Sequence, residues 1–243
     1  MGLKILIHGS LGRMGASLKQ AAEDGNHTIS AGIDLGDSVA EAIDQAEIAI
    51  DFSHHSATPV LADCAGKKGI PIVIGTTGHS DQEREKILAD LKSVPVVWAG
   101  NYSLGVNLLF YLSQKASEIL PNTFDVEVLE MHHRFKKDAP SGTAENLLDR
   151  IQSASHRSDH QLVHGRQGIT GERTDREIGV HSLRGGDAVG DHTVQFSAFG
   201  ERLELTHRAS DRMIFARGAI HAAEWVVSQP AGLYNMQDVL GLK

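Results

Sequence analysis

The sequence contains a single cysteine, few aromatic residues and no long apolar run. Cys64 on its own excludes an internal disulfide and fits a reducing compartment. No apolar stretch approaches the roughly 20 residues of a membrane span. The first residues, MGLKILIHG, run directly into a glycine turn, which is typical of a strand and not of a signal peptide. We therefore expect a soluble, cytoplasmic protein that makes no membrane contact.

Basic side chains are also in the minority. The 23 Lys and Arg residues face 31 Asp and Glu residues, for a net charge of −8. This balance argues against broad nucleic-acid binding, which requires a concentrated positive field, but it permits a local basic pocket for a small anion. The chain has 14 histidines, and His54 and His55 are adjacent. No H-E-x-x-H motif, cysteine pair or carboxylate cluster accompanies them, so we expect no metal site.

The N-terminal stretch has the pattern of a dinucleotide-binding unit. An apolar strand over residues 3–8 is followed at once by G-S-L-G-R-M-G at residues 9–15 and then by a helix. The next strand, Thr28–Ile33, ends in Asp34, about 20 residues after the last glycine, where a carboxylate would bind ribose hydroxyls. Glycines permit the tight turn and the close approach of a pyrophosphate to the helix start. The alternative is a glycine-rich turn with no ligand.

The alternation of strands and helices then continues. Further strands are expected over residues 48–52, 70–74 and 94–98. Between them, Thr58-Pro59 is typical of a helix start with Thr as the cap, and Ser80 and Glu83 have capping-box spacing. This order predicts a doubly wound parallel sheet of the Rossmann type, in which ligands lie at the carboxyl ends of the strands. The loops at 75–78 and 99–103 fall at that edge, together with the first glycine loop.

From Leu104 onward the pattern changes to one helix, over 104–119, followed by several strands. Strands are expected around 126–132, 164–170, 177–183, 193–199 and 202–207, separated by glycine turns, with one more helix after residue 141. This predicts an α+β domain for substrate binding and oligomerisation, with a mostly antiparallel sheet. The sheet face without helices needs a partner if it is not charged. A helix over 215–227 returns to the first domain, giving domains of 1–103 plus 213–243, and 104–212.

The segment EMHHRFKKDAPSGTA, residues 130–144, combines two histidines, two lysines and a helix start. Backbone N–H groups at a helix start, with hydroxyls and lysines nearby, form a receptor for a carboxylate or phosphate. His132 and His133 add groups that exchange protons near neutral pH. The alternative is a polar loop before an ordinary capped helix.

Several segments together resemble one enzyme family. They are GSLGRMG, GTTG, GNYSLGVNLL, EMHHRFKKDAPSGTA, SLRGGDAVGDHTVQF, GERLELTHRASDRMIFARGA and GLYNMQDVLGL. In this order, over essentially the whole chain, they resemble the 4-hydroxy-tetrahydrodipicolinate reductases of lysine biosynthesis. The resemblance implies hydride transfer from NADH or NADPH to a cyclic imine dicarboxylate, with loss of water, giving tetrahydrodipicolinate.

The resemblance also implies site residues. His132 matches the family's proton donor and acceptor, and Lys136 matches its second proton donor. The substrate carboxylates would be held by His133, Ser141, Gly142 and Thr143. The cofactor would be held by Gly9, Ser10, Leu11, Gly12, Arg13, Met14, Asp34, Gly75, Thr76, Thr77, Ala99, Gly100, Asn101 and Tyr102. Family members form homotetramers through the sheet of the second domain, which suits the uncovered face expected above.

The end of the second strand favours one cofactor. Asp34 is followed by Leu35 and Gly36, with no arginine or lysine. A carboxylate binds the free ribose hydroxyls of NADH and repels a 2′-phosphate. We therefore expect a preference for NADH, with NADPH tolerated if Arg13 or a more distant cation reaches its phosphate.

Two other functions fit parts of the pattern. One is a different dinucleotide-dependent reductase with the same two-domain plan, acting for example on a sugar, but it would lack the dense HH-x-x-K and SGT pocket. The other is a non-catalytic sensor of NAD(H). A sensor needs a module that binds DNA or a partner, and neither a helix-turn-helix pattern nor a basic face is evident.

Overall fold

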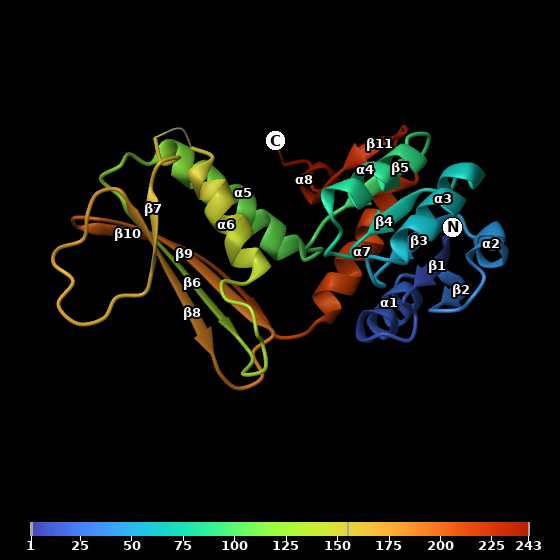
Figure 1. Ribbon diagram of the computed structural model, residues 1–243, viewed down its shortest axis with the longest axis horizontal. Coiled ribbons are helices and arrows are strands. Elements are labelled where there is room, and N and C mark those ends of the chain that lie inside the picture. Colours follow the sequence, from blue (N-terminus) through green and yellow to red (C-terminus); the bar gives the residue numbers. More distant parts are fainter. Residues whose placement is uncertain (1, 155, 243) are drawn as a thin grey trace. The chain divides into compact units, whose positions relative to one another are not determined.

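The structure is a computed structural model that describes residues 2–154 and 156–242. It divides into two compact units, one formed by Met1–Leu104 with Arg212–Lys243 and the other by Gly105–Asp211. The expected boundaries were 1–103 with 213–243, and 104–212. Figure 1 shows the second unit inserted in the chain between the two parts of the first, as the sequence colours indicate.

The first unit contains a parallel sheet with the strand order β11-β5-β4-β3-β1-β2. Its strands are β1 (Lys4–His8), β2 (Thr28–Ile33), β3 (Ile48–Asp51), β4 (Ile72–Ile74), β5 (Pro95–Trp98) and β11 (Gly232–Tyr234). All neighbouring strands pair in parallel. The doubly wound sheet expected from the sequence is therefore confirmed. The edge strand β11 is an addition, because the sequence pattern predicts no strand after the helix over 215–227.

Successive residues of each strand point to opposite faces of this sheet, and each face has its own apolar core. Ile5, Ile7 and Ile50 pack with α1 (Arg13–Asp24), α7 (Met213–Val226) and α8 (Met236–Val239). Leu6, Ala49 and the other strand residues that point to the opposite face pack with a second set of helices. That set is α2 (Val39–Ala42), η1 (Ile43–Gln45), α3 (Thr58–Lys68) and α4 (Asp81–Asp90). Burial on both faces explains why the strands read as continuous apolar runs.

The helix starts confirm one expectation and correct another. Ser80 and Glu83 form the predicted capping box at the start of α4, with the Glu83 N–H donating to Ser80 Oγ at 3.3 Å. Thr58, in contrast, does not cap α3, because Ala57 occupies that position. The Thr58 hydroxyl instead donates to the buried carboxylate of Asp51 at 2.6 Å. A buried carboxylate gains more from a directed donor than an exposed helix end does, which explains this exchange of partners.

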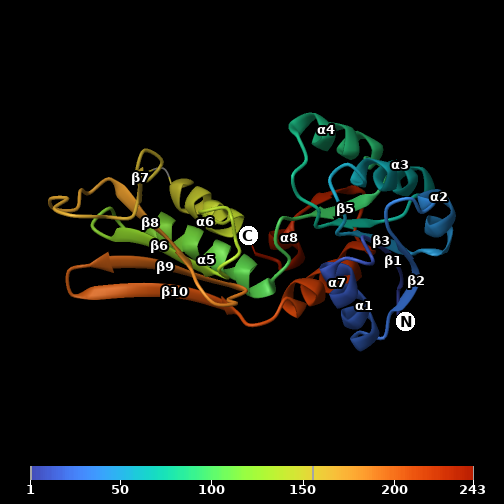
Figure 2. The same ribbon diagram turned by 60° about the horizontal axis from the view of Figure 1, so that its bottom comes forward.

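The second unit contains a five-stranded sheet with the order β10-β9-β6-β8-β7. Its strands are β6 (Asp125–His132), β7 (Gln161–His164), β8 (Glu177–Arg184), β9 (Gly190–Ala198) and β10 (Glu201–Ala209). The pairs β6–β9 and β9–β10 are antiparallel, as expected, whereas β6–β8 and β7–β8 are parallel, so the sheet is mixed. Helices α5 (Leu104–Ile119) and α6 (Gly142–Gln152) lie against one face, where they share a core with β6, β8 and β9 (Figures 1 and 2).

The strand expected over 164–170 is wrong. β7 ends at His164, and Gly165, Gly168 and Gly171 follow with φ near +70°. These left-handed conformations are readily accessible to glycine but interrupt an extended strand. The result is a loop over 165–176, whose Arg166 and Arg173 bind Glu127 on the sheet face opposite the helices.

Among the described residues, no helix is long and apolar enough to cross a membrane.

Candidate active site

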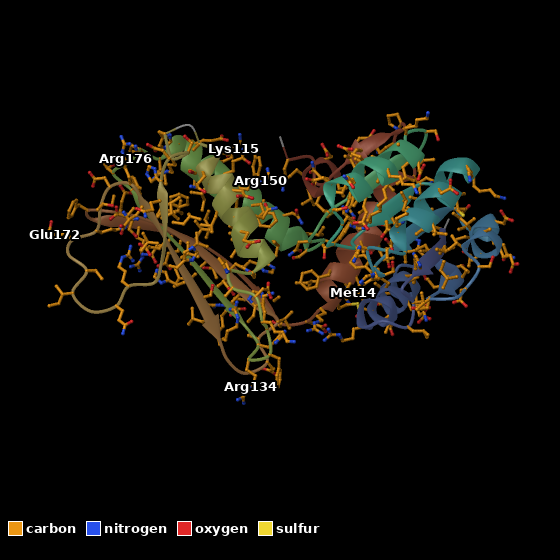
Figure 3. All side chains as sticks on the ribbon, viewed as in Figure 1. Met14, Lys115, Arg134, Arg150, Glu172 and Arg176 are labelled. Carbon is orange, nitrogen blue, oxygen red and sulfur yellow. The ribbon has the colours of Figure 1, made fainter. Side chains whose placement is uncertain are left out.

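The loop that follows β6 carries the central motif, and backbone hydrogen bonds to the segment after β8 fix its start. The His133 N–H donates to the Ala188 carbonyl at 2.8 Å, and the Arg134 N–H donates to the Gly186 carbonyl at 3.1 Å. In the other direction, Gly185 N–H donates to the His132 carbonyl at 3.0 Å. Arg134 is exposed at the tip of this loop and points away from the sheet (Figure 3). Hydrogen bonds to the segment after β8 therefore hold the start of the loop in a fixed position.

His132 is the last residue of β6, and its side chain is 11% exposed. Its Nδ1 lies 2.5 Å from Oε2 of Glu130, two residues earlier on the same face of the strand. Its Nε2 lies against Gly190, where an added Cβ would come within 3.0 Å. Desolvation lowers the pKa of His132 below its usual 6.5, and this effect exceeds the opposing influence of Glu130. The imidazole of the free protein is therefore neutral at pH 7.

A second histidine, His192 on β9, stands beside the first. The two rings meet edge to face with their centroids 5.1 Å apart. His192 is 3% exposed, and burial and the neighbouring His132 lower its pKa to about 4. Its Nε2 lies 3.2 Å from Oγ of Ser141, and that oxygen accepts the Ala144 N–H as the N-cap of α6. The strand that carries His132 is thereby connected to the helix start that carries the predicted carboxylate receptor.

Lys136 lies on the same loop and is held by an acidic neighbour. Its Nζ donates to Oδ2 of Asp138 at 2.8 Å, and its side chain is 21% exposed. Hydrogen bonding from Lys136 lowers the pKa of the Asp138 carboxyl below 3.8. The ammonium is therefore oriented by a carboxylate that is ionised at neutral pH.

The predicted substrate-binding residues flank this centre. Ser141 is buried and caps α6, Gly142 is exposed, and Thr143 and His133 are half-buried. The first turn of α6 presents its N-terminus here, which favours negative charge. His132, Lys136 and these residues therefore come together on β6, one loop and one helix start, all within the second unit.

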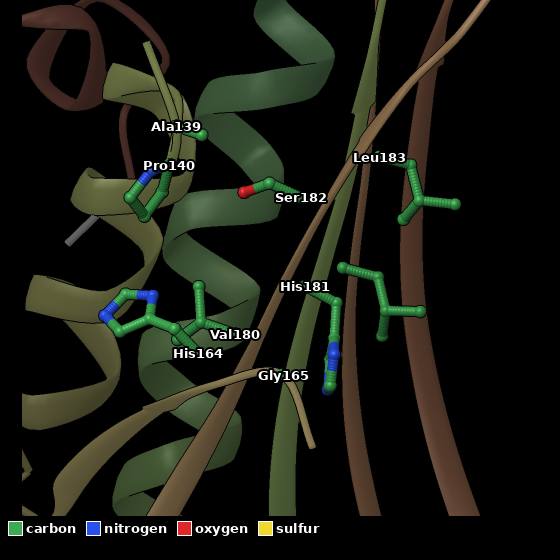
Figure 4. Close-up of a pocket in the computed structure, with 9 residues that line it drawn as sticks. Ala139, Pro140, His164, Gly165, Val180, His181, Ser182 and Leu183 are labelled. Carbon is green, nitrogen blue, oxygen red and sulfur yellow. The ribbon is translucent and has the colours of Figure 1, made fainter. Parts of the chain in front are cut away.

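A pocket of about 700 Å³ lies beside this loop. It is lined by residues of β8 and by Ala139, Pro140 and His164, and the hydroxyl of Ser182 points toward the two loop residues (Figure 4). None of the predicted catalytic residues lines it. The pocket is therefore not the site that the sequence predicts, although it adjoins the same loop.

In the first unit, the glycine loop lies between β1 and α1 and is bound to the end of β2. Gly9 has φ of +87°, and a Cβ there would approach the Phe52 carbonyl oxygen to 2.4 Å. A Cβ on Gly15 would lie 2.3 Å from the Gly9 oxygen. No side chain caps α1 in the described structure. Asp34 accepts the Ser10 hydroxyl at 2.7 Å and the Leu11 N–H at 3.0 Å. The close-packed loop, the uncapped helix start and the adjacent carboxylate fit a dinucleotide.

The other predicted cofactor residues lie at the ends of β4 and β5. Gly75, Thr76 and Thr77 follow β4, and Thr76 is buried, with its Oγ1 accepting the Ser53 N–H at 3.0 Å. Ala99, Gly100, Asn101 and Tyr102 follow β5. Tyr102 is 1% exposed, and its hydroxyl donates to the carbonyls of Ile74 and Val97 at 2.8 and 3.0 Å. The buried Tyr102 side chain therefore links the ends of β4 and β5, where the two loops begin. Arg13 and Met14 begin α1; Arg13 is exposed, whereas Met14 is half-buried and packs against the core.

Sequence reasoning did not single out three polar residues that contact this machinery: Glu130, Arg184 and His192. Glu130 is 1% exposed and accepts both terminal nitrogens of Arg184, at 2.8 and 2.9 Å. The alternation of β6 does carry a signal for Glu130, because it places this carboxylate on the same face as Val126 and Val128. In the first unit, buried Asp51 was missed in the same way. Burial would raise its pKa, but the nearby His8 and hydrogen bonds from Ser53 and Thr58 hold the pKa below 3.8.

Comparisons with known proteins agree along the whole chain. A family profile described as "Dihydrodipicolinate reductase, N-terminus" matches residues 3–102, and one described as "Dihydrodipicolinate reductase, C-terminus" matches residues 105–240. The chain is 50% identical over 242 residues to a 4-hydroxy-tetrahydrodipicolinate reductase of Akkermansia muciniphila, covering 99% of this chain and 98% of that protein. It is 43% identical to the enzyme of the same name from Thiobacillus denitrificans, with both chains covered completely.

Among solved structures, the chain resembles a dipicolinate-bound dihydrodipicolinate reductase from Paenisporosarcina sp. TG-14. The TM-score is 0.78 at 22% identity, and the match covers 97% of this chain and 98% of that one. At this identity the likeness concerns the fold.

Proposed function

The chain belongs to the dihydrodipicolinate reductase family, and from this membership we propose which of its residues perform the family's reaction. The protein is an NAD(P)H-dependent oxidoreductase that reduces 4-hydroxy-tetrahydrodipicolinate to tetrahydrodipicolinate, with loss of water, in the diaminopimelate route of lysine biosynthesis. This membership favours neither a sugar reductase nor a non-catalytic sensor.

We propose that His132 donates and accepts a proton in this reaction and that Lys136 is the second proton donor. The proposal rests on where these two residues lie. His132 ends β6, and Lys136 lies on the loop that follows it, whose start is held by backbone hydrogen bonds beside the N-terminus of α6. A hydride that enters a conjugated imine leaves electron density on carbon and nitrogen, so a positioned acid has to supply a proton. The two substrate carboxylates would bind to the α6 N-terminus through Gly142 and Thr143, with His133 beside them. Their negative charge would raise the pKa of His132 and favour its protonated form.

The bound nicotinamide cofactor supplies the hydride. Gly9, Ser10, Leu11, Gly12, Arg13 and Met14 would bind its pyrophosphate at the start of α1, and Asp34 would bind the ribose next to it. Asp34 already contacts the Ser10 hydroxyl and the Leu11 N–H, so it is placed to exchange these donors for ribose hydroxyls. The segments 75–77 and 99–102 would hold the remainder at the carboxyl ends of β4 and β5.

A direct assay tests the activity. Purified protein mixed with NADH and freshly prepared condensation product of aspartate semialdehyde and pyruvate is expected to oxidise NADH, followed by absorbance. The rate should depend on both reactants. No oxidation of NADH or NADPH under these conditions would contradict the assignment.

The cofactor preference is a separate prediction. NADH is expected to give a higher kcat/KM than NADPH, because the Asp34 carboxylate repels a 2′-phosphate and the exposed Leu35 and Gly36 offer it no cation. Asp34→Asn should narrow the ratio of the two kcat/KM values, whereas Glu41→Gln on α2 should leave it unchanged. A kcat/KM tenfold higher for NADPH would show that Asp34 does not select the cofactor.

We also propose that the protein is a homotetramer that buries the open face of the second sheet. At the β6 start this face carries the ion pairs of Glu127 with Arg166 and Arg173, and toward the β6 end it carries Leu129, Met131 and Leu183. Leu183 is 48% exposed. A face with both directed charges and apolar side chains suits a self-complementary interface. Light scattering at micromolar concentration should give about four times 26.2 kDa; the mass of a single chain would contradict the proposal.

A further inference from the structure

Glu130 is a carboxylate on the apolar face of a central strand, where a charge is costly unless it is fully paired. Its side chain has no exposed surface. Its neighbours along the strand on that face, Val126 and Val128, are completely buried core residues. An apolar side chain at this position would serve packing better. The presence of a carboxylate here therefore calls for a role other than stability.

The contacts of Glu130 define its charge state. Arg184 donates Nη2 to Oε1 and Nη1 to Oε2, the paired geometry of a guanidinium and a carboxylate. Burial alone would raise the pKa of Glu130, but hydrogen bonds from Arg184, Ser182 and His132 lower it below 4.5. Glu130 is thus ionised at neutral pH and can only accept hydrogen bonds.

An acceptor-only partner determines which nitrogen of His132 carries hydrogen. Because Oε2 of Glu130 lies 2.5 Å from Nδ1, that nitrogen must be the donor. The proton that His132 gains or loses is therefore the one at Nε2, the nitrogen on the Gly190 side of the ring. From this geometry we infer that Glu130 and Arg184 are positioning residues, which fix the tautomer and orientation of His132 so that it exchanges its proton at Nε2. This inference rests on the role proposed above for His132.

Arg184 also helps to position Lys136, the second proposed proton donor. Besides binding Glu130, its Nη2 donates to the backbone carbonyl of Asp138 at 2.7 Å. The carboxylate of Asp138 in turn holds Nζ of Lys136. One guanidinium thus ties the strand end that carries His132 to the loop that carries Lys136. The register of β6 and β8, which places Arg184 opposite His132, creates this connection.

The charged and titratable groups that act on His132 are Glu130 on its own strand, Lys136 on the loop, Arg184 on β8 and His192 on β9. Of these, only Glu130 favours the protonated imidazole. A neutral residue in its place removes that support, so the pKa of His132 must fall further. The limb of the pH–kcat profile that belongs to His132 should then move to lower pH.

Glu130→Gln is the first test, because glutamine keeps the shape and one acceptor but removes the charge. We expect kcat to fall about ten- to a hundredfold, the range found when the hydrogen-bonding partner of a metal-bound histidine is removed. KM for the dicarboxylate should change little, and the His132 limb should shift to lower pH. Glu130→Asp, which restores the charge at a shorter reach, should recover part of kcat and return the limb toward its original pH.

A double-mutant cycle separates positioning from a structural role. If Glu130 acts through His132, Glu130→Gln should lower kcat no further in a His132→Ala background. The matched control is Glu127→Gln, which also removes an arginine-bound carboxylate from β6 but on the opposite face. It should leave the position of the limb unchanged. Thermal unfolding of each variant checks that it is folded.

The outcomes are distinguishable. Equal losses from Glu130→Gln with and without His132, or an unmoved limb, would overturn the positioning role while leaving the role of His132 intact. A normal kcat in His132→Ala would instead remove His132 from the mechanism, and the inference with it. NADH oxidation by the parent protein is tested independently of both.

Discussion

The His132→Ala variant is expected to turn over its substrate about a hundred- to ten-thousand-fold more slowly, because a positioned general acid typically contributes that factor. The effect should fall on kcat more than on KM, since the proton is transferred in the transition state and the carboxylates are bound elsewhere. Steady-state kinetics measures both constants. A fluorescence titration should show unchanged NADH affinity, because the proposed cofactor residues belong to the other unit.

Two variants control this result. His181→Ala removes another half-buried histidine of the same sheet, one whose Nε2 binds Glu127 on the face away from His132, and it should retain kcat. Thr143→Ala should mainly raise KM, because it weakens anchoring of a substrate carboxylate in the ground state. If His132→Ala keeps a near-normal kcat while both controls behave as described, His132 has a structural role at the end of β6.

The fold of the first unit could be predicted because its signals are local. Apolar runs, glycine turns and the capping box at Ser80 each lie within a few residues, and their alternation alone implies a parallel sheet. The errors arose where a competing hydrogen bond or a left-handed backbone conformation overrides the local pattern. Thr58 has the local signature of a helix cap, but its hydroxyl is taken by Asp51, which belongs to the preceding strand. In the segment after His164, residues such as Ile169 and Thr170 favour a strand, whereas the backbone at Gly165 and Gly168 prevents it.

The residues of the candidate site also divide into those that a local motif reveals and those that it does not. His132, Lys136 and Ser141 could be singled out because they lie close together in one motif. Arg184 and His192 lie some fifty residues further along the chain, and they reach Glu130 and Ser141 only through the register of β8 and β9 with β6. A sequence shows that Glu130 alternates with the core valines. It does not show which strand brings the arginine that neutralises it, because parallel pairing of β6 with β8 depends on the whole sheet.

Replacing Lys136 by alanine is expected to damage catalysis through two losses at once. The ammonium is a proposed proton donor, and it is also the half-buried cation of the loop, held by Asp138. Its removal should lower kcat by at least about a hundredfold, the lower end for a general acid. KM for the dicarboxylate should rise as well, because Asp138 loses its ion pair with Lys136 and remains as an unpaired anion that repels the substrate.

Lys136→Arg separates these two losses, because guanidinium keeps the positive charge but does not release a proton near neutral pH. KM should therefore recover toward the parent value while kcat stays low. Lys137→Ala is the matched control: it removes the adjacent lysine, which is exposed, and both constants should remain close to those of the parent enzyme. If Lys136→Arg restores kcat together with KM, the side chain contributes only its charge, and the proton must reach the substrate from His132 or from water.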